Sequence, residues 1–277
     1  MEIRKTSDAL PSALQKKDEI LNRLGERTLA IFLDYDGTLT PIVEDPKKAA
    51  LSDKARKVIN RLAKYYLVAI ISGRDLEDVY KMVGIDDIAY AGSHGFDIIG
   101  PSGKYRDWHI GGPFLPVLKS AEKELRTVLK DIRGARVERK RFAISTHYRQ
   151  VESTSINTLE QRFDLVLLHH PELRKTTGKK VFELRPNIEW DKGRALLHLL
   201  EAFYNDSGRV LPVYIGDDTT DEDAFRAIID LGVAIAVYNE TYPTIAHYAL
   251  RDPHEVVDFL QEIAEYAEKE TFQGASG

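Results

Sequence analysis

Ile31-Phe32-Leu33-Asp34-Tyr35-Asp36-Gly37-Thr38-Leu39-Thr40 is the stretch of sequence that decides the fold. An apolar run that begins at Leu29 stops abruptly at Asp34, so we expect a buried strand followed by a turn. Two carboxylates one residue apart at the end of a buried strand are costly to bury unless a cation compensates them. Ligands of open α/β sheets bind beyond the carboxyl ends of the strands. The stretch therefore predicts a magnesium-dependent site with Asp34 at its centre.

On both sides of this stretch the hydrophobic pattern alternates between strand and helix. We expect buried strands at residues 28–34, 66–71, 87–91, 210–215 and 232–237, the last of these being the final strand. We expect helices at residues 12–25, 52–65, 76–83 and 191–203, with Asp75 able to cap the third. A further helix is expected to follow the acidic run at 217–223 and to end at 230, and two more are expected at 244–250 and 255–269. This alternation predicts an α/β fold, a parallel sheet with helices on both faces.

Between residues 110 and 187 the rhythm changes. A long helix over 114–132, two strand-like runs, a helix over 155–169 and a hairpin give an αββαββ order. We therefore predict three segments: a first part of the core at 1–109, an inserted α/β cap domain at 110–187 and a second part of the core at 188–277.

Composition excludes several classes of function. The chain of 277 residues has 30% charged residues, a net charge of −5 and no cysteine. Disulfides, thiolate metal sites and cysteine catalysis are excluded, and nothing in the charge favours nucleic acid or an anionic membrane as a partner. No apolar run approaches membrane-spanning length and no secretory signal is evident, so we expect a cytoplasmic protein.

Polar side chains follow four of the predicted strands. Asp34 and Asp36 follow the first, Ser72 the second and His94 the third. The fourth carries Asp217, Asp218 and Asp221. Carboxylates brought together at one sheet edge would repel one another, and a hard cation with oxygen ligands resolves the conflict. Mg²⁺ is the predicted cofactor.

Each group at this edge suits a step of phosphoryl transfer. Asp34 can attack phosphorus as a nucleophile, and Asp36 can protonate the leaving alkoxide and later deprotonate water. Ser72 and the Gly73 amide can donate to phosphate oxygens, and Lys192 supplies a positive charge. Asp217 is the preferred further metal ligand. Asp218 and Asp221 can bind the metal directly, act through water or hold Lys192.

Four motifs in this order resemble those of the haloacid dehalogenase-type phosphatases: Asp34-x-Asp36-Gly37-Thr38, Ser72-Gly73-Arg74, Lys192, and Gly216-Asp217-Asp218-x-x-Asp221. Longer strings, among them Gly-Ser-His-Gly at 92–95 and Arg-Pro-x-x-x-Trp-Asp-Lys-Gly at 185–193, resemble the trehalose-6-phosphate phosphatases. The resemblance implies a Rossmann-like core with an inserted cap, and metal ligation by the Asp34 carboxylate, the Asp36 carbonyl and Asp217. It also implies hydrolysis of trehalose 6-phosphate, a small-molecule sugar phosphate.

Glu138, Arg141 and Glu183 lie on strand-like runs of the cap and are predicted to face the sugar, although ion pairs within the cap would explain them equally. His94 is predicted to lie beside the site, with a satisfied loop histidine as the alternative. Three rival functions stay open: a phosphatase for sucrose phosphate or mannosyl-phosphoglycerate, a hexose phosphomutase, and a non-catalytic domain that binds a sugar phosphate or a protein. The sequence names no protein partner.

Overall fold

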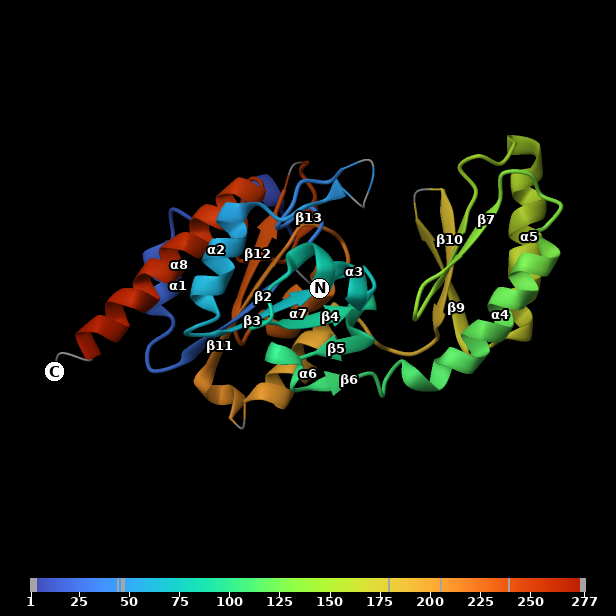
Figure 1. Ribbon diagram of the computed structural model, residues 1–277. Helices are drawn as coiled ribbons and strands as arrows, with labels where there is room; N and C mark the ends of the chain where they lie inside the picture. The colour runs from blue at the N-terminus through green and yellow to red at the C-terminus, as the bar shows by residue number, and fades with distance from the viewer. Residues whose placement is uncertain are drawn as a thin grey trace. The chain divides into compact units, whose positions relative to one another are not determined.

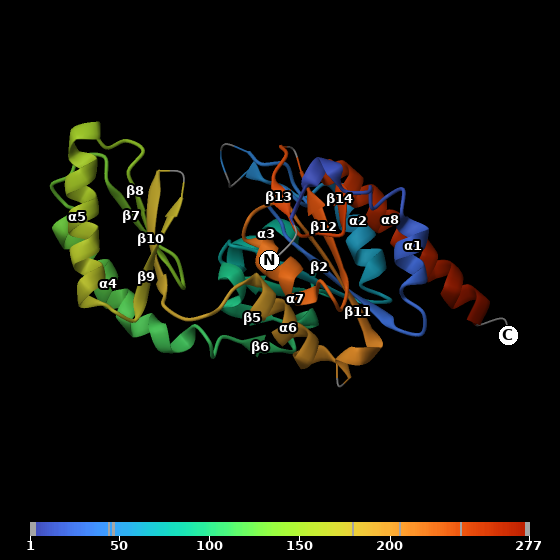
Figure 2. The ribbon, with the colours of Figure 1, turned by 180° about the vertical axis from the view of Figure 1, so that it is seen from behind.

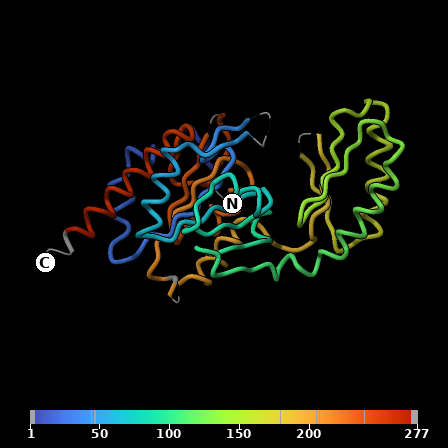
Figure 3. The backbone as a smooth tube through the Cα atoms, in the orientation of Figure 1, coloured from blue at the N-terminus to red at the C-terminus, as the bar shows by residue number. Residues whose placement is uncertain are grey.

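A computed structural model describes residues 4–43, 45, 48–178, 180–204, 206–238 and 240–274. The chain divides into two compact units, Met1–Arg106 with Trp190–Gly277, called the core unit below, and Asp107–Glu189, called the inserted unit. The sequence placed the insertion at 110–187. In the backbone trace of Figure 3 the inserted unit is one continuous run of chain. Each unit is described by itself.

The core unit confirms the predicted α/β class. Its eight-stranded sheet has the order β14-β12-β11-β2-β3-β4-β5-β6. The strands are β2 (Thr28–Leu33), β3 (Leu67–Ile71), β4 (Ala89–Gly92), β5 (Asp97–Ile99), β6 (Arg106–Asp107), β11 (Val210–Gly216), β12 (Val233–Val237) and β14 (Tyr248–Leu250). Neighbouring strands from β14 to β4 pair in parallel, and β5 returns antiparallel to β4. Parallel pairing brings the carboxyl ends of β11, β2 and β3 to one edge.

Helices cover both faces of this sheet. The helices are α1 (Lys17–Asn22), α2 (Asp53–Leu62), α3 (Leu76–Val83) and α8 (Pro253–Gly274) on one face, and α6 (Lys192–Phe203) and α7 (Asp221–Ile228) on the other. Figure 1 shows α2 and α8 together, and Figure 2 shows α6 and α7 from behind. Along β2, Ile31 and Leu33 pack toward the first group and Phe32 toward the second, because successive side chains of a strand point to opposite faces.

The interior of β2 is therefore apolar on both sides, as a strand buried in a parallel sheet requires.

Among the described residues, the structure has no helix both long and apolar enough to cross a membrane.

Three local predictions were wrong. The helix expected at 244–250 is instead β13 (Pro243–Thr244), which pairs with β1 (Lys5–Thr6), followed by the edge strand β14, so β12 is not the final strand. The helix expected at 12–25 is only the short α1. Asp75 occupies the N-cap position of α3 without a side-chain cap bond, and accepts a hydrogen bond from Ser93 Oγ at 2.8 Å instead. Tertiary contacts differ from the local pattern in each case: strand pairing at 243–250, a bridge between Ser12 and Ala249 where the first helix was expected to begin, and the Ser93 hydrogen bond at Asp75.

The inserted unit has the predicted αββαββ order. Its elements are α4 (Leu115–Val128), β7 (Arg136–Arg139), β8 (Ile144–His147), α5 (Ser153–His169), β9 (Leu173–Gly178) and β10 (Val181–Pro186). The strands form an antiparallel sheet of order β7-β8-β10-β9, and α4 and α5 cover one of its faces (Figure 1). Helix α4 ends at Val128 rather than at the expected 132, and turns follow directly after Val128.

The face of this sheet away from α4 and α5 carries polar residues. On β10, Phe182 and Leu184 enter the hydrophobic core of the unit, so Glu183 points to the opposite face. On β7, Val137 packs against the same core, which directs Glu138 to the same face as Glu183.

Candidate active site

Asp34, Ser72 and Asp217 meet at the carboxyl edge of the core sheet. The Asp34 amide donates to Ile215 O at 2.9 Å, and the Ser72 amide donates to Ala91 O at 2.9 Å, so the strand pairing continues into the site. Gly37 has φ +87°, and a Cβ atom there would lie 2.0 Å from Asp217 Oδ2. The positive φ favours glycine at this turn, and the backbone there passes close to the Asp217 carboxylate.

An acidic cluster lies at the centre of this edge. Asp34, Asp217 and Asp221 each offer a carboxylate oxygen, and these oxygens lie within 4.8 Å of one another. Burial raises the pKa of Asp34, with Lys192 acting in the opposite direction. Burial, followed by the charge of Asp221, raises the pKa of Asp217 to about 7. Grouped hard oxygen donors that resist ionising together fit a divalent cation such as Mg²⁺.

Lys192 connects two members of this cluster. Its Nζ donates to Asp34 Oδ1 at 2.8 Å and to Asp221 Oδ1 at 2.7 Å, and the lysine is only 3% exposed. Burial acts to lower the pKa of Lys192, but the charges of Asp221 and Asp34 outweigh it and raise that pKa. The ammonium is therefore charged and held beside Asp34. The position of Lys192 as the first residue of α6 fixes this placement.

Asp221 uses its acceptor capacity on protein donors. Oδ1 accepts from Lys192 and from the Tyr214 hydroxyl at 2.6 Å, while Oδ2 accepts from the amides of Asp217 at 2.9 Å and Asp218 at 3.0 Å. A carboxylate has about four lone-pair sites, so a direct metal bond would displace one of these donors. Of the alternatives open from the sequence, holding Lys192 is the one whose contacts are present.

Asp218 faces a different set of partners. Its Oδ1 accepts from the Thr220 amide at 2.7 Å and the Thr220 hydroxyl at 2.6 Å. Burial would raise the pKa of Asp218, but Lys192 and the Thr220 hydrogen bonds lower it. Asp218 is thus an ionised carboxylate beside the cluster whose hydrogen bonds close the turn before α7.

Asp36 differs from Asp34 in exposure and partner. Its side chain is 41% exposed, against 7% for Asp34. Arg74 holds the Asp36 carboxylate with two hydrogen bonds, Nε to Oδ2 at 2.6 Å and Nη2 to Oδ1 at 2.5 Å, and the guanidinium lies 5.6 Å from the centre of the Tyr35 ring. The sequence motif contained Arg74, but sequence reasoning gave it no partner.

Ser72, Gly73 and His94 form the side of the site that follows β3 and β4. Ser72 is 1% exposed, and its Oγ accepts from the Arg74 amide at 3.2 Å. A Cβ atom at Gly73 would lie 2.8 Å from the His94 ring, so glycine is what lets the ring approach. His94 has φ +58° and its amide donates to Ser72 O at 2.8 Å. The predicted neighbourhood of Ser72, Gly73 and His94 is present in the core unit.

In the inserted unit, Glu183 lies at the centre of an ion cluster. Its Oε1 accepts from Lys140 Nζ at 2.9 Å and from Ser145 Oγ at 2.5 Å, and its Oε2 accepts from Arg185 Nε at 3.0 Å. Burial alone would raise the pKa of Glu183, but Lys140 and Arg185 outweigh it and lower the pKa to about 2. Sequence reasoning missed Lys140, whose position beside Arg141 offered no signal for the pairing.

Glu138 and Arg141 have other partners in the same unit. Glu138 Oε2 contacts His147 Nε2 at 2.8 Å and accepts from Arg136 Nη2 at 3.2 Å. The Arg141 guanidinium lies over the Trp108 ring at 4.6 Å, and Trp108 is 49% exposed. These contacts give each side chain a structural partner, and the sugar-facing roles of Glu138, Arg141 and Glu183 remain predictions.

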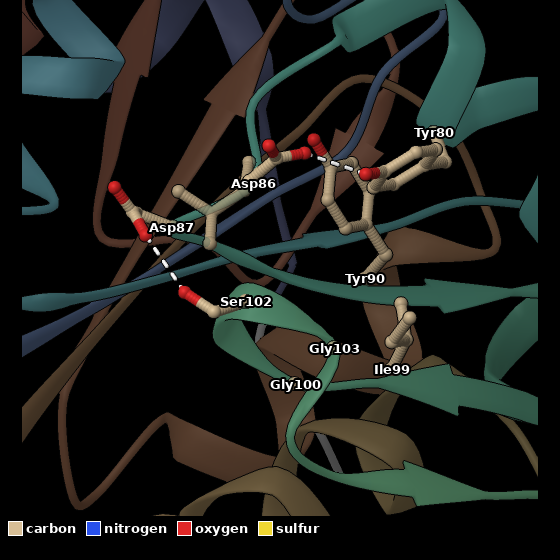
Figure 4. A pocket seen from close by; sticks show the side chains of 9 residues that line it. Tyr80, Asp86, Asp87, Tyr90, Ile99, Gly100, Ser102 and Gly103 are labelled. Atoms are coloured by element: carbon tan, nitrogen blue, oxygen red, sulfur yellow. Dashed lines mark hydrogen bonds between the residues drawn. The ribbon is translucent and has the colours of Figure 1, made fainter.

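A separate pocket of about 410 Å³ lies elsewhere on the core unit (Figure 4). It is formed by Tyr80, Asp86, Asp87, Ile88, Tyr90, Ile99, Gly100, Ser102 and Gly103. Asp86 and Asp87 precede β4, so the pocket lies toward the amino end of a strand whose carboxyl end leads to His94. Its carboxylates already accept from Tyr80 at 2.5 Å and from Ser102 at 2.8 Å, and it contains none of the predicted site residues.

Comparison with known proteins gives a consistent result. The family model for trehalose-phosphatase matches residues 32–254. The chain is 41% identical over 268 residues to the probable trehalose-phosphate phosphatase I of Arabidopsis thaliana, covering 92% of this chain and 73% of that protein. Aspergillus fumigatus trehalose-6-phosphate phosphatase has a similar structure, with a TM-score of 0.70 and 26% identity, covering 93% of this chain and 100% of that one. A haloacid dehalogenase-like hydrolase from Bacteroides thetaiotaomicron, 17% identical, shares the fold with a TM-score of 0.59, over 88% of this chain and 99% of that one.

Proposed function

The chain belongs to the trehalose-phosphatase family, with a core of the haloacid dehalogenase type, and on that basis we propose that it hydrolyses trehalose 6-phosphate to trehalose and inorganic phosphate. The observation that carries the proposal is the position of Asp34 at the carboxyl edge of the sheet, bonded to Lys192 and with a carboxylate oxygen within 4.8 Å of one of Asp217. A carboxylate held beside a fixed ammonium and further acids is equipped for covalent phosphoryl transfer.

In the first half of the proposed reaction, Asp34 attacks the phosphorus atom of the substrate. The bond between phosphorus and the sugar oxygen breaks, and Asp36 gives a proton to the departing alkoxide. This leaves a phosphate group covalently bound to Asp34 and releases trehalose. Lys192, 2.8 Å from Asp34, stabilises negative charge on the transferring group.

In the second half, Asp36 removes a proton from a water molecule, which attacks the same phosphorus atom. The bond to Asp34 breaks and inorganic phosphate leaves. Ser72 and the Gly73 amide are proposed to donate to phosphate oxygens in both halves. Asp34, the Asp36 carbonyl and Asp217 would hold Mg²⁺, which when bound neutralises charge on the phosphoryl group.

Recognition of the sugar is proposed to come from the inserted unit. Glu138, Arg141 and Glu183 lie on or next to the strands of its sheet, and the Glu183 cluster adds Lys140 to this set. Sugar hydroxyls are both donors and acceptors, and fixed carboxylates with an ammonium group match them. Because the cluster is already bonded within the protein, its side chains are ordered before a ligand binds.

A phosphate-release assay tests the proposal. Trehalose 6-phosphate, sucrose 6-phosphate, mannosyl-3-phosphoglycerate and p-nitrophenyl phosphate are compared, each with Mg²⁺ and with EDTA. We expect a clear preference for trehalose 6-phosphate in the presence of Mg²⁺. Preference for another sugar phosphate would refute the substrate, and undiminished release in EDTA would refute the metal requirement. A requirement for a bisphosphorylated hexose would indicate a mutase instead.

A further inference from the structure

Tyr214 places a hydroxyl group deep in the core sheet, beneath the acidic cluster. The residue lies in β11, two positions before Gly216, and is 0% exposed. Its hydroxyl donates to Asp221 Oδ1 at 2.6 Å, and Lys192 donates to the same oxygen at 2.7 Å. A polar group in this position is unusual, because the remainder of β11 is apolar and buried on both faces.

Asp221 is the point where three parts of the site are tied together. Through Oδ1 it holds Lys192 and Tyr214, and through Oδ2 it holds the amides of Asp217 and Asp218. A Cβ atom at Gly216 would lie 2.3 Å from Asp221 Cγ, so the strand also passes directly against this carboxylate. The direction of the Lys192 ammonium toward Asp34 therefore depends on how Asp221 is oriented.

We propose that Tyr214 is a positioning residue that orients Asp221, and through it Lys192, for the reaction at Asp34. The inference rests on the proposed phosphatase function. With the tyrosine hydroxyl present, Oδ1 divides its acceptor capacity between two donors, and Lys192 keeps its second bond to Asp34. Without the hydroxyl, Oδ1 has only Lys192 as a partner and draws the ammonium away from the nucleophile.

The Tyr214 ring is well fixed for such a role. It packs edge-on against Phe225 of α7, with ring centres 5.7 Å apart and planes at 79°. The hydroxyl reaches Asp221 from the strand, while Lys192 reaches it from α6, so the two donors are held by separate elements. Burial, and then the charges of Asp221 and Asp34, raise the pKa of Tyr214, which keeps the hydroxyl protonated as a donor.

Tyr214→Phe removes the hydroxyl and leaves the packing volume in place. Tyr90→Phe is the matched control, because Tyr90 is also buried in the core sheet and its hydroxyl bonds Ile85 O at 2.7 Å, in the pocket of Figure 4 rather than the acidic cluster. We expect Tyr214→Phe to lower kcat by about tenfold or more, as loss of a hydrogen bond to a charged group in a transition-state network does. We expect KM to change by less than about twofold, because the proposed sugar contacts lie elsewhere, whereas Tyr90→Phe keeps kcat.

A second comparison separates positioning from a general loss of stability. In an Asp221→Asn background, adding Tyr214→Phe should lower kcat by no more than about twofold, since the hydroxyl acts through the carboxylate that is already gone. Thermal unfolding of all variants is measured in parallel. If Tyr214→Phe lowers kcat no more than Tyr90→Phe, or if its effect is fully additive to Asp221→Asn, the inference is wrong.

Both trehalose 6-phosphate and p-nitrophenyl phosphate are used as substrates. If the wild-type protein hydrolyses the aryl phosphate but not the sugar phosphate, the proposed substrate fails while the role of Tyr214 is still tested at Asp34. If the wild-type protein hydrolyses both and Tyr214→Phe is unimpaired on both, only the positioning role is refuted. Absence of hydrolysis of either by the wild-type protein refutes the phosphatase proposal and the inference with it.

Discussion

Replacing Glu183 with glutamine should make the inserted unit less stable at neutral pH but not in strong acid. Glu183 is 8% exposed and bonds Lys140, Ser145 and Arg185 within the unit. Lys140 and Arg185 overcome the effect of burial and lower its pKa from 4.5 to about 2. At about 1.4 kcal/mol for each pKa unit, this difference corresponds to about 3 kcal/mol of folding free energy at neutral pH.

The sign follows from the direction of the shift. The unfolded chain binds a proton at Glu183 more readily than the folded chain, so the stabilisation is complete above pH 4.5 and is lost as the pH falls toward about 2. Glu183→Gln lacks this titration. The difference in unfolding free energy between wild type and Glu183→Gln should therefore shrink across that window.

Hydrogen exchange of β8 and β10 reports the opening free energy of this unit without requiring the whole chain to unfold in one step. Urea unfolding measured at about pH 7 and about pH 3 gives the same comparison for the protein as a whole. Glu160→Gln is the control, because Glu160 pairs with Lys175 on the other side of the unit and is 42% exposed. A difference of the same size at both pH values, or none at neutral pH, would refute the reasoning.

Other expected outcomes concern the acidic cluster and the sugar. Asp34→Asn should abolish phosphate release while leaving the circular dichroism spectrum intact, and substantial remaining turnover would contradict a covalent mechanism. Burial raises the pKa of Asp217 to about 7, so without metal the folded protein holds a proton there that the unfolded chain loses at lower pH. The free energy of unfolding should therefore fall as the pH rises from 3.8 through about 7. Asp217→Asn should remove this loss in EDTA, and should also remove any rise of Tm caused by Mg²⁺. Glu138→Ala should impair hydrolysis of trehalose 6-phosphate far more than that of p-nitrophenyl phosphate, and equal losses would exclude it from sugar binding.

The sheet and the polar residues at its carboxyl edge were predictable because the information is local. Asp34 and Asp217 each come directly after a strand whose apolar pattern is unambiguous. Parallel pairing then leaves few ways to arrange these strands in a sheet. The edge strand β14 was not predictable, because Tyr248–Leu250 is short and is fixed by pairing with β12 rather than by its own pattern. Over only three residues, the hydrophobic pattern of a helix cannot be distinguished from that of a short edge strand.

The sequence also did not predict the hydrogen-bond and ion-pair partners of the site residues. Arg74 and Lys140 were both in view as charged residues, but their pairing with Asp36 and Glu183 joins positions 38 and 43 residues apart. Tyr214 appeared to be one more apolar position in a buried strand. A hydroxyl hidden among valines and isoleucines gives no signal in sequence until the carboxylate that it bonds is placed in space.

The two carboxylates of Asp34-x-Asp36 differ in burial in the way that their proposed roles require. Asp34 lies against Lys192, which fixes one oxygen of its carboxylate and leaves it little freedom to move, as a nucleophile that must meet phosphorus in line requires. Asp36 has a side chain 41% exposed, and Arg74, whose own side chain is 14% exposed, holds it with two hydrogen bonds. A group that carries protons to a leaving alkoxide and from water needs that access. The different exposure of the two side chains thus supports the proposed roles, Asp34 as nucleophile and Asp36 as the residue that transfers protons.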